Sequence, residues 1–432
     1  MPQPVASAVP HEDADAALKK TTQQAFIDTE EKYGAHNYHP LPVVLERGER
    51  CYMWDTDGKK YFDFLAAYSA VNQGHCHPHI VKAMTQQCQK LTLTSRAFHN
   101  NVYAGYTKFI TDFFGYDKVL PMNTGVEGTE TAVKLMRKWG YDKRGVEENM
   151  ATIVFAHNNF WGRSVCAVST STDPDCYKGF GPYAPGFHLI PYNDIPALEK
   201  AFASDPNIVG VCYEPIQGEA GIICPDEDFF PKVAALCKEH NALLCCDEIQ
   251  TGLCRTGKML CSEHYGIRPD IVVLGKALSG GMYPVSAVLC DDDIMLNIKP
   301  GQHGSTYGGN PLGCAVAKAA LEVLRDEKMA DHAQAMGEVF RKELKAFEYK
   351  WIKDVRGKGL LNALEVDPAF AEKVTAWQVC MGMAEKGLLA KPTHENIIRF
   401  APPLCITLEE LHQALEIIKS TLAEFDQKVS KM

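Results

Sequence analysis

Five short apolar runs dominate the middle of the chain, between about residues 123 and 290. They are residues 152–156, 208–213, 242–246, 271–274 and 285–290. The runs are rich in Val, Ile, Leu and Cys and barely alternate with polar residues, which is typical of strands buried on both faces. Between two of them, residues 229–240 carry apolar side chains at helical spacing. This alternation predicts an α/β fold built on a large, mostly parallel sheet.

The two ends of the chain contain shorter and more mixed elements. Strands are expected at residues 43–45, 52–55, 61–64, 353–355, 360–366 and 397–400, with Asp57-Gly58 as a hairpin turn. Helices are expected at residues 331–347, 370–387 and 407–426. We therefore expect residues 65–324 to form one large domain. Residues 1–64 and 325–432 are expected to form a smaller α+β domain, with residues 1–20 as a loose arm.

Composition argues against several classes of protein. The 432 residues include 44 Lys+Arg and 54 Asp+Glu, so there is no basic excess with which to bind nucleic acid. No apolar stretch approaches the roughly 18 residues of a membrane span, so no membrane partner is expected. The 16 cysteines are scattered without a CxxC pair, which favours a reducing compartment. We expect a cytoplasmic protein, or one of the mitochondrial matrix if a presequence was removed.

Two charged residues follow neighbouring runs in the large domain. Asp247 comes directly after residues 242–246, and Lys276 comes two residues after 271–274. Each could be an ordinary cap or a solvated charge, but the carboxyl ends of parallel strands meet at one edge, where ligands bind. Apolar neighbours would desolvate Lys276 and lower its pKa, as a Schiff-base lysine requires. An Asp that holds a pyridine nitrogen completes the usual pair for pyridoxal phosphate (PLP).

PLP also needs a place for its phosphate. Asn123-Thr124-Gly125-Val126 precedes a helical run at 130–139, and a helix N-terminus binds anions, although an ordinary turn and cap would look the same. A second Gly/hydroxyl cluster, at residues 304–309, also precedes a helix and could supply a hydroxyl.

Two other motifs point to different chemistry. Residues 252–258 match the first seven positions of a P-loop, but Met259 stands where a magnesium-binding Ser or Thr is required. Nucleotide binding is therefore the alternative from another class. The His75-Cys76-His77-Pro78-His79 segment has no distant partner cluster and is interpreted as a turn, so no metal site is expected.

Six longer motifs together resemble one family. They are GKALSGG around Lys276, DEIQTG from Asp247, EPIQGE from Glu214, YGAHNYHPLP from Tyr33, YSAVNQGHCHP from Tyr68 and HGSTYGGNPL from His303. The chain is similar to the class-III (omega) aminotransferases of the fold-type-I PLP enzymes, from about residue 33 to 426, and above all to members that act on ornithine. One departure stands out: Gly128-Thr129 replaces the small residue and glycine of many relatives, and we expect Thr129 to cap the helix that Gly128 loosens.

The resemblance implies a set of residues that bind the cofactor. Lys276 would carry PLP and move the proton, and Asp247 would pair with the pyridine nitrogen. The remaining implied contacts are Gln250 to the phenolic oxygen, Phe160 on the ring, Glu214 close by, Gly125 and Val126 to the phosphate, and Thr306 to the phosphate of a neighbouring subunit. The last contact implies a homodimer.

The resemblance also implies the substrates and their contacts. The δ-amino group of ornithine would pass to 2-oxoglutarate by a ping-pong route, giving glutamate and glutamate 5-semialdehyde, which cyclises to pyrroline-5-carboxylate. Arg163 and Arg399 would bind carboxylates, and Glu219 would pair with Arg399 while ornithine is bound. Tyr38 and Tyr68 would hold ornithine, and they argue against the alternative of an omega-aminotransferase for acetylornithine or 4-aminobutyrate.

Overall fold

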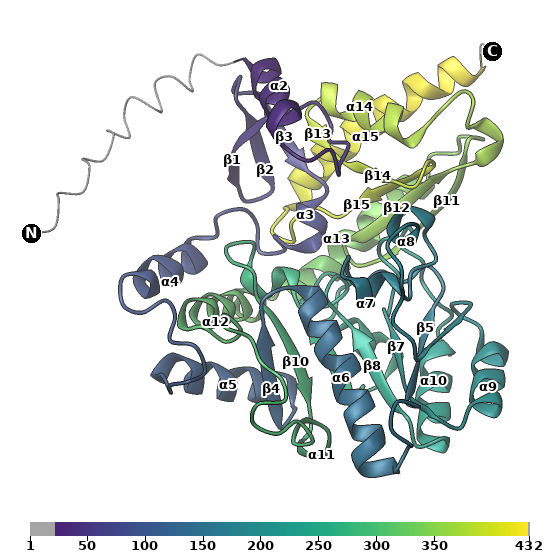
Figure 1. Cartoon of the computed structure of the whole chain (residues 1–432). Coiled ribbons are helices and arrows are strands. Elements are labelled where there is room, and N and C mark those ends of the chain that lie inside the picture. The colour runs from purple at the N-terminus through teal and green to yellow at the C-terminus, as the bar shows by residue number, and fades with distance from the viewer. Residues whose placement is uncertain (1–21, 431–432) are drawn as a thin grey trace, which may run out of the picture.

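A seven-stranded sheet forms the centre of the fold in the computed structural model, which describes residues 22–430 (Figure 1). Its strand order is β4-β10-β9-β8-β7-β5-β6. The strands are β4 (Lys118–Met122), β5 (Thr152–Ala156), β6 (Phe187–Ile190), β7 (Ile208–Tyr213), β8 (Leu243–Asp247), β9 (Ile271–Leu274) and β10 (Ser286–Cys290). From β9 to β6 all neighbours are parallel, and β10 runs antiparallel to both β9 and β4. The prediction of an α/β fold with a mostly parallel sheet is confirmed.

Most of the expected strands lie where the apolar runs placed them. β5, β7 and β9 match the predicted bounds, and β8 and β10 each begin one residue later. Asp247 is itself the last residue of β8, because it still pairs with Val273 of β9. β4 and β6 were not anticipated: β4 contains Pro121 and β6 contains His188, which interrupt the apolar pattern.

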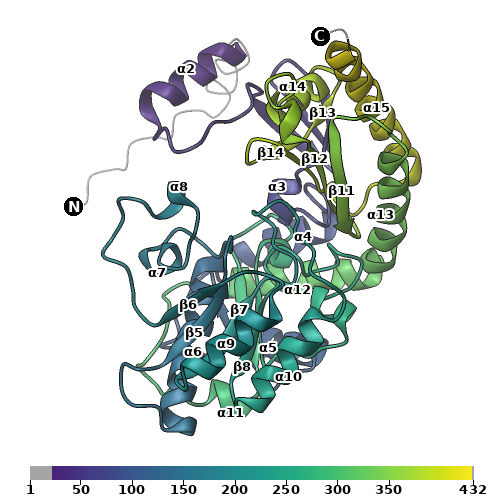
Figure 2. The ribbon, with the colours of Figure 1, turned by 90° about the vertical axis from the view of Figure 1, so that its right-hand side faces the viewer.

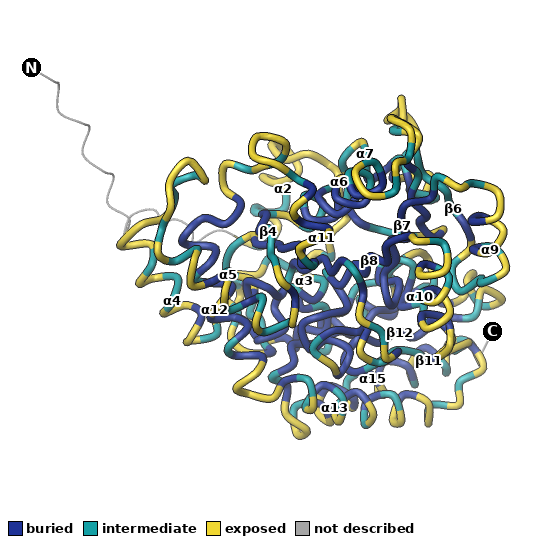
Figure 3. Tube along the Cα trace, turned by 90° about the horizontal axis from the view of Figure 1, so that it is seen from below, coloured by how far each residue is buried: buried dark blue, intermediate teal, exposed yellow. Residues whose placement is uncertain are grey.

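Helices cover both faces of this sheet (Figures 1 and 2). On one face α6 (Gly125–Arg144) packs against Val209, Leu243 and Cys245. On the other face α9 (Ile195–Ser204) and α10 (Phe229–Glu239) pack against Leu244 and Cys246. Alternate residues of one strand thus enter opposite cores, so both faces must be apolar. Viewed from below, the strands β7 and β8 are buried along their length (Figure 3).

Two smaller sheets lie beyond the carboxyl edge of the large one. The first joins β1 (Leu45–Glu49), β2 (Tyr52–Asp55) and β3 (Lys60–Asp63) to β13 (Leu388–Leu389), so the two ends of the chain share a sheet. The second has the order β11 (Ile352–Lys358), β12 (Leu361–Val366), β15 (Ile397–Phe400) and β14 (Lys391–Thr393), all antiparallel. α13 (Met329–Lys345), α14 (Ala376–Glu385) and α15 (Leu408–Ser430) accompany these sheets.

The remaining helical elements complete the described part of the chain. They are α2 (Gln23–Tyr33), α3 (Ala66–Ser69), α4 (Pro78–Cys88), α5 (Asn101–Phe114), α7 (Val165–Val168), α8 (Pro174–Tyr177), α11 (Asp292–Met295), α12 (Pro311–Asp326) and the 3₁₀ turns Cys261–Tyr265, Lys276–Ser279 and Pro368–Phe370. Two predicted elements begin later in the structure than the sequence indicated. The strand expected at 43–45 begins only at Leu45, and the helix expected at 370–387 begins at Ala376, where Thr375 accepts the N–H of Gln378 as an N-cap.

The division into domains, at residues 64/65 and 324/325, stays a proposal, which the shared sheet of the two chain ends supports. The predicted arm at residues 1–20 lies outside the described residues. Within residues 22–430, no helix has the length and apolar character needed to cross a membrane.

Candidate active site

The carboxyl ends of β8 and β9 bring Asp247 and Lys276 to one cavity of about 230 Å³. The predicted residues that also line this cavity are Gly125, Val126, Phe160, Glu214 and Gln250. Trp161, Gly162 and Ile249 line it as well, although the sequence predicted no role for them. Five chain segments that are distant in sequence therefore form one site, as the rule for parallel sheets predicts.

Lys276 begins a single 3₁₀ turn and has a φ of 44°, which is unusual for a residue other than glycine. Burial lowers the pKa of its amine, while the nearby carboxylates Glu219 and Asp247 raise it in part. A lysine with a lowered pKa is neutral more often, and the neutral amine is the nucleophilic form.

Asp247 is only 5% exposed, and burial raises the pKa of its carboxyl to about 6. The N–H of Ile249 donates to Oδ1 at 3.0 Å, and the Thr129 hydroxyl lies 3.3 Å from Oδ2. These donors, together with the charge of Lys276, favour the ionised form. The carboxylate can therefore pair with a cationic ring nitrogen at neutral pH.

The expectation that Thr129 caps α6 is wrong. Thr124 is the N-cap, and it forms a capping box with Glu127. Thr129 is fully buried one turn further on, where its hydroxyl faces Asp247. Gly128 packs closely on the sheet, since a Cβ there would lie 2.9 Å from Val273 Cγ1. The sequence signal for both residues was their departure from the family pattern.

The start of α6 offers free donors to the cavity. The Glu127 carboxylate accepts the N–H groups of Asn123, at 3.1 Å, and Thr124, at 2.7 Å. For the N–H groups of Gly125 and Val126, no acceptor is found among the described residues. Two free N–H groups at the positive end of a helix are suited to a phosphate.

Glu214 is buried at the wall of the cavity, beside the backbone of Phe160 and Gly218. Burial and the charge of Asp247 raise the pKa of its carboxyl to about 8. It accepts the N–H of Phe160 at 3.2 Å and that of Gly218 at 3.3 Å. Glu214 thereby fixes the backbone that presents the Phe160 ring to the cavity.

A second polar cluster adjoins the cavity through Gln250. Its Oε1 accepts from Arg399 Nη2 at 3.0 Å, and its Nε2 donates to Glu219 Oε1 at 3.2 Å. Arg399 Nη1 lies 2.8 Å from Glu219 Oε2, and the Arg399 side chain is only 3% exposed. Burial opposes the charge of Glu219, but Arg399 and Lys276 outweigh it and lower the pKa of this carboxyl to about 2.

Tyr68 covers Arg399, whose Cζ lies 5.0 Å from the centre of the ring. The residues Ala66 to Ser69 all have φ between 47° and 70°, so a short left-handed turn directs Tyr68 to this position. Such a turn is costly for residues with a side chain. Burial raises the pKa of the Tyr68 phenol, and the Glu219 carboxylate raises it further.

Three predicted residues lie outside these two clusters. Tyr38 is 74% exposed. Arg163 is exposed, with its guanidinium 5.5 Å from the centre of the Phe160 ring. Thr306 is exposed too, although its neighbour Ser305 accepts from Asn123 Nδ2 at 3.0 Å, close to the start of α6.

The segment that resembles a P-loop has a structural role. Arg255 at its centre is fully buried and donates to Asn72 Oδ1 at 2.6 and 3.1 Å. It also donates to the carbonyls of Leu360, at 2.9 Å, and Pro402, at 2.6 Å. Arg255 therefore links three segments that are distant in sequence. Its side chain points into the protein interior and stabilises the fold there.

The cavity has the groups that PLP requires. Its walls carry a lysine of lowered pKa, a buried carboxylate, an aromatic ring and two free N–H groups of α6. These groups match an aldehyde, a pyridine nitrogen, a ring face and a phosphate.

Comparison with known proteins identifies the family. A family model described as aminotransferase class-III matches residues 33–422. The chain belongs to the class-III aminotransferases. It is therefore a PLP-dependent transferase.

Individual relatives extend the comparison. The ornithine aminotransferase, mitochondrial, of Rattus norvegicus is 59% identical over 414 residues, which cover 95% of this chain and 94% of the relative. The ornithine aminotransferase of Toxoplasma gondii, solved with partial occupancy of PLP at its active site, is 46% identical with a TM-score of 0.94 and covers 98% of this chain and 100% of its own. The acetylornithine aminotransferase of Elizabethkingia anophelis is 52% identical with a TM-score of 0.85. The match covers 94% of this chain and 100% of that protein.

Proposed function

We propose that this class-III aminotransferase transfers the δ-amino group of ornithine to 2-oxoglutarate. The observation that carries the proposal is the Glu219–Arg399 pair beside Tyr68, next to the cavity that holds Lys276. An arginine that meets a protein carboxylate in one half of the reaction and a substrate carboxylate in the other suits a donor with one carboxylate and an acceptor with two. The relatives that bear the name ornithine aminotransferase support the same substrate.

In this proposal the cavity residues hold the cofactor. Asp247 pairs with the ring nitrogen, Phe160 lies on the ring, and the N–H groups of Gly125 and Val126 bind the phosphate. Gln250 reaches the phenolic oxygen, while Glu214 keeps the Phe160 backbone in place. Bound PLP supplies an electron sink for the charge that develops when the substrate loses its proton. The amine of Lys276 accepts that proton at Nζ and would deliver it to the carbon of the cofactor's aldehyde group.

The second cluster selects the substrates. While ornithine is bound, Glu219 neutralises Arg399, because a buried cation without a partner is unfavourable. Tyr68 and Tyr38 hold the amino-acid end of ornithine. When 2-oxoglutarate or glutamate binds, Glu219 moves aside, and Arg399 and Arg163 each take a carboxylate. Arginine suits this task because its planar fork grips both oxygens.

The assembly and the compartment are further parts of the proposal. A homodimer would bring Thr306, which is exposed on this chain, to the phosphate of the neighbouring site. The scattered cysteines favour a reducing compartment, and we propose the cytoplasm, with the mitochondrial matrix as the alternative. Cell fractionation of the tagged protein distinguishes the two.

The donor profile tests the function. With 2-oxoglutarate as acceptor, turnover is compared for ornithine, acetylornithine and 4-aminobutyrate. We expect a clear preference for ornithine, and pyrroline-5-carboxylate as product. Acetylornithine is the main alternative substrate, because the enzyme of Elizabethkingia anophelis that bears its name is 52% identical. A preference for acetylornithine or 4-aminobutyrate would refute the assignment and leave the family unchanged.

A further inference from the structure

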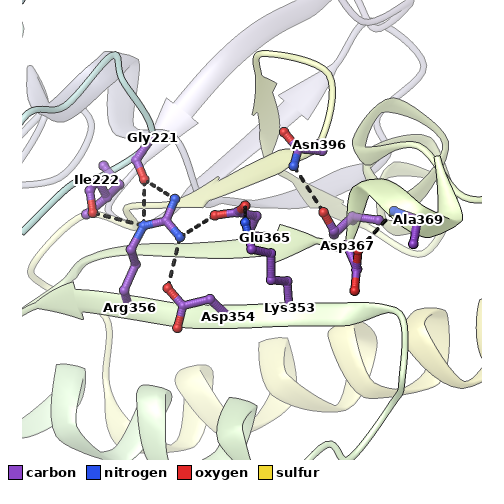
Figure 4. Close-up of polar contacts among 10 residues, drawn as sticks. Gly221, Ile222, Lys353, Asp354, Arg356, Glu365, Asp367, Ala369 and Asn396 are labelled. Carbon is purple, nitrogen blue, oxygen red and sulfur yellow. Dashed lines mark hydrogen bonds and ion pairs between the residues drawn. The ribbon is translucent and has the colours of Figure 1, made fainter. Parts of the chain in front are cut away.

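Arg356 of β11 donates hydrogen bonds to the backbone of the loop that carries Glu219, at Gly221 and Ile222 (Figure 4). Arg356 donates Nε and Nη2 to the carbonyl oxygen of Gly221, at 3.0 and 2.8 Å, and Nε also reaches the carbonyl of Ile222 at 3.2 Å. These partners are 135 and 134 residues away in sequence. One guanidinium edge therefore fixes two successive peptide groups, which a lysine ammonium cannot do with the same geometry.

The other edge of Arg356 is held by carboxylates of its own sheet. Nη1 lies 2.6 Å from Glu365 Oε2 on β12 and 2.9 Å from Asp354 Oδ2 on β11 (Figure 4). The Arg356 side chain is 16% exposed, and that of Glu365 13%. The guanidinium is thus held from both sides and has little freedom to release the loop. Lys353 pairs with the same Glu365, at 2.7 Å, but has no contact with the loop among the described residues.

Two more contacts hold the same loop on the sheet of β11, β12, β15 and β14. The Thr393 hydroxyl of β14 donates to the carbonyl of Glu219 at 3.1 Å. Gly221 has a φ of 108°, and a Cβ there would lie 2.5 Å from Ile397 Cδ1. Ile397 stands two residues before Arg399 on β15. The sheet that carries Arg399 therefore also holds the backbone from Glu219 to Ile222.

We propose that Arg356 is a positioning residue that keeps the Glu219 carboxylate against Arg399, and that it thereby sets the preference between ornithine and dicarboxylic amino acids. The inference rests on the proposed role of Glu219. Without the Arg356 clamp the loop is free to shift, Glu219 pairs less often with Arg399, and Arg399 becomes available to the side-chain carboxylate of glutamate. The discrimination against glutamate as amino donor then falls.

The test is a specificity ratio in half-reactions of the holoenzyme. The value of kcat/KM is measured separately for ornithine and for glutamate, each without acceptor, from the change in cofactor absorbance. We expect Arg356→Met to lower the ornithine-to-glutamate ratio about tenfold, and Arg356→Lys, which keeps the ion pairs, about threefold. The matched control Lys353→Met removes an ion pair to Glu365 but spares the loop, so its ratio stays at the wild-type value.

A double-mutant cycle separates positioning from a general loss of structure. If Arg356 acts through Glu219, then Arg356→Met causes no further change of the ratio in the Glu219→Gln background. Equal losses for both amino acids, or additive effects in the double variant, would overturn the proposal. Arg356→Lys provides the same reading if Arg356→Met folds poorly. The wild-type donor profile is measured first. A protein that does not prefer ornithine disproves the proposed function. The coupling between Arg356 and Glu219 can then still be measured from kcat/KM for glutamate in the single and double variants.

Discussion

Glu219 and Arg399 form an ion pair in which Arg399 is buried and Glu219 is partly exposed, with Oε2 and Nη1 2.8 Å apart and Gln250 bonded to both partners. The pair makes stability depend on pH, because the pKa of Glu219 falls from 4.5 to about 2 in the folded chain. A depressed carboxyl pKa adds stability that is fully present above pH 4.5 and is lost as pH falls through about 2. Glu219→Gln leaves Arg399 unpaired, and we expect it to cost about 3 kcal/mol at pH 7.

The measurement is the thermal midpoint of both proteins between pH 7 and pH 3.5. The gap between wild type and Glu219→Gln narrows below pH 4.5, because Glu219 takes up a proton in the unfolded wild-type chain while it stays ionised in the folded one down to about pH 2. A gap that is constant over this range would show that the charge of Glu219 contributes nothing.

Tyr68→Phe separates the ring of Tyr68 from its hydroxyl. The ring remains over Arg399, at the present 5.0 Å, so the cluster keeps its packing. The loss of one hydrogen bond to a charged substrate group lowers kcat/KM for ornithine about tenfold. 4-Aminobutyrate lacks the α-amino group and is affected less. The control is Tyr349→Phe, at a tyrosine that stacks on Trp351 just before β11. This variant leaves kcat/KM unchanged for both ornithine and 4-aminobutyrate.

Lys276→Ala tests the cavity against the P-loop alternative. Removal of the amine lowers transamination by roughly 10⁴-fold or more, because nucleophile and proton carrier are lost together. Borohydride treatment, which attaches the cofactor to Lys276 in the wild type, no longer labels that position. The matched variant Lys258→Ala removes the exposed lysine of the P-loop-like segment and leaves turnover intact. If Lys258→Ala lost activity and Lys276→Ala kept it, the site would be misassigned.

The sequence predicted the framework of this site better than its inner contacts. The apolar runs placed Asp247 and Lys276 at one edge of the sheet, because buried strands are recognised by such runs and the carboxyl ends of parallel strands meet at one edge. The left-handed turn at Ala66 to Ser69 had no such signal, since none of these residues is glycine. The contact of Thr129 with Asp247 joins residues 118 apart and depends on how α6 rotates on the sheet. Such contacts depend on tertiary packing, which cannot be predicted from the local sequence.

Thr129→Val tests that contact with an isosteric side chain. The hydroxyl favours the ionised Asp247, so its loss raises the pKa of this carboxyl above its present value of about 6. A protonated Asp247 cannot pair with the ring nitrogen. PLP binding to the apoenzyme therefore weakens most near pH 6.5 and recovers at pH 8.5, as titration by fluorescence would reveal. Thr129→Ser keeps the wild-type profile, and equal weakening at both pH values would point to packing alone.

Gly140→Ala tests how closely α6 lies on the sheet that supports the cavity. A Cβ at Gly140 would stand 2.2 Å from Val209 Cγ1 of β7, so helix and strand must move apart. Such overpacking costs about 1–3 kcal/mol and lowers the thermal midpoint. In α5, Gly105 is the matched control, because its Cβ would meet nothing within 4 Å. Gly105→Ala should be neutral or stabilising by up to about 1 kcal/mol, since alanine favours helices. An unchanged midpoint for Gly140→Ala would mean that the α6–β7 contact yields without cost.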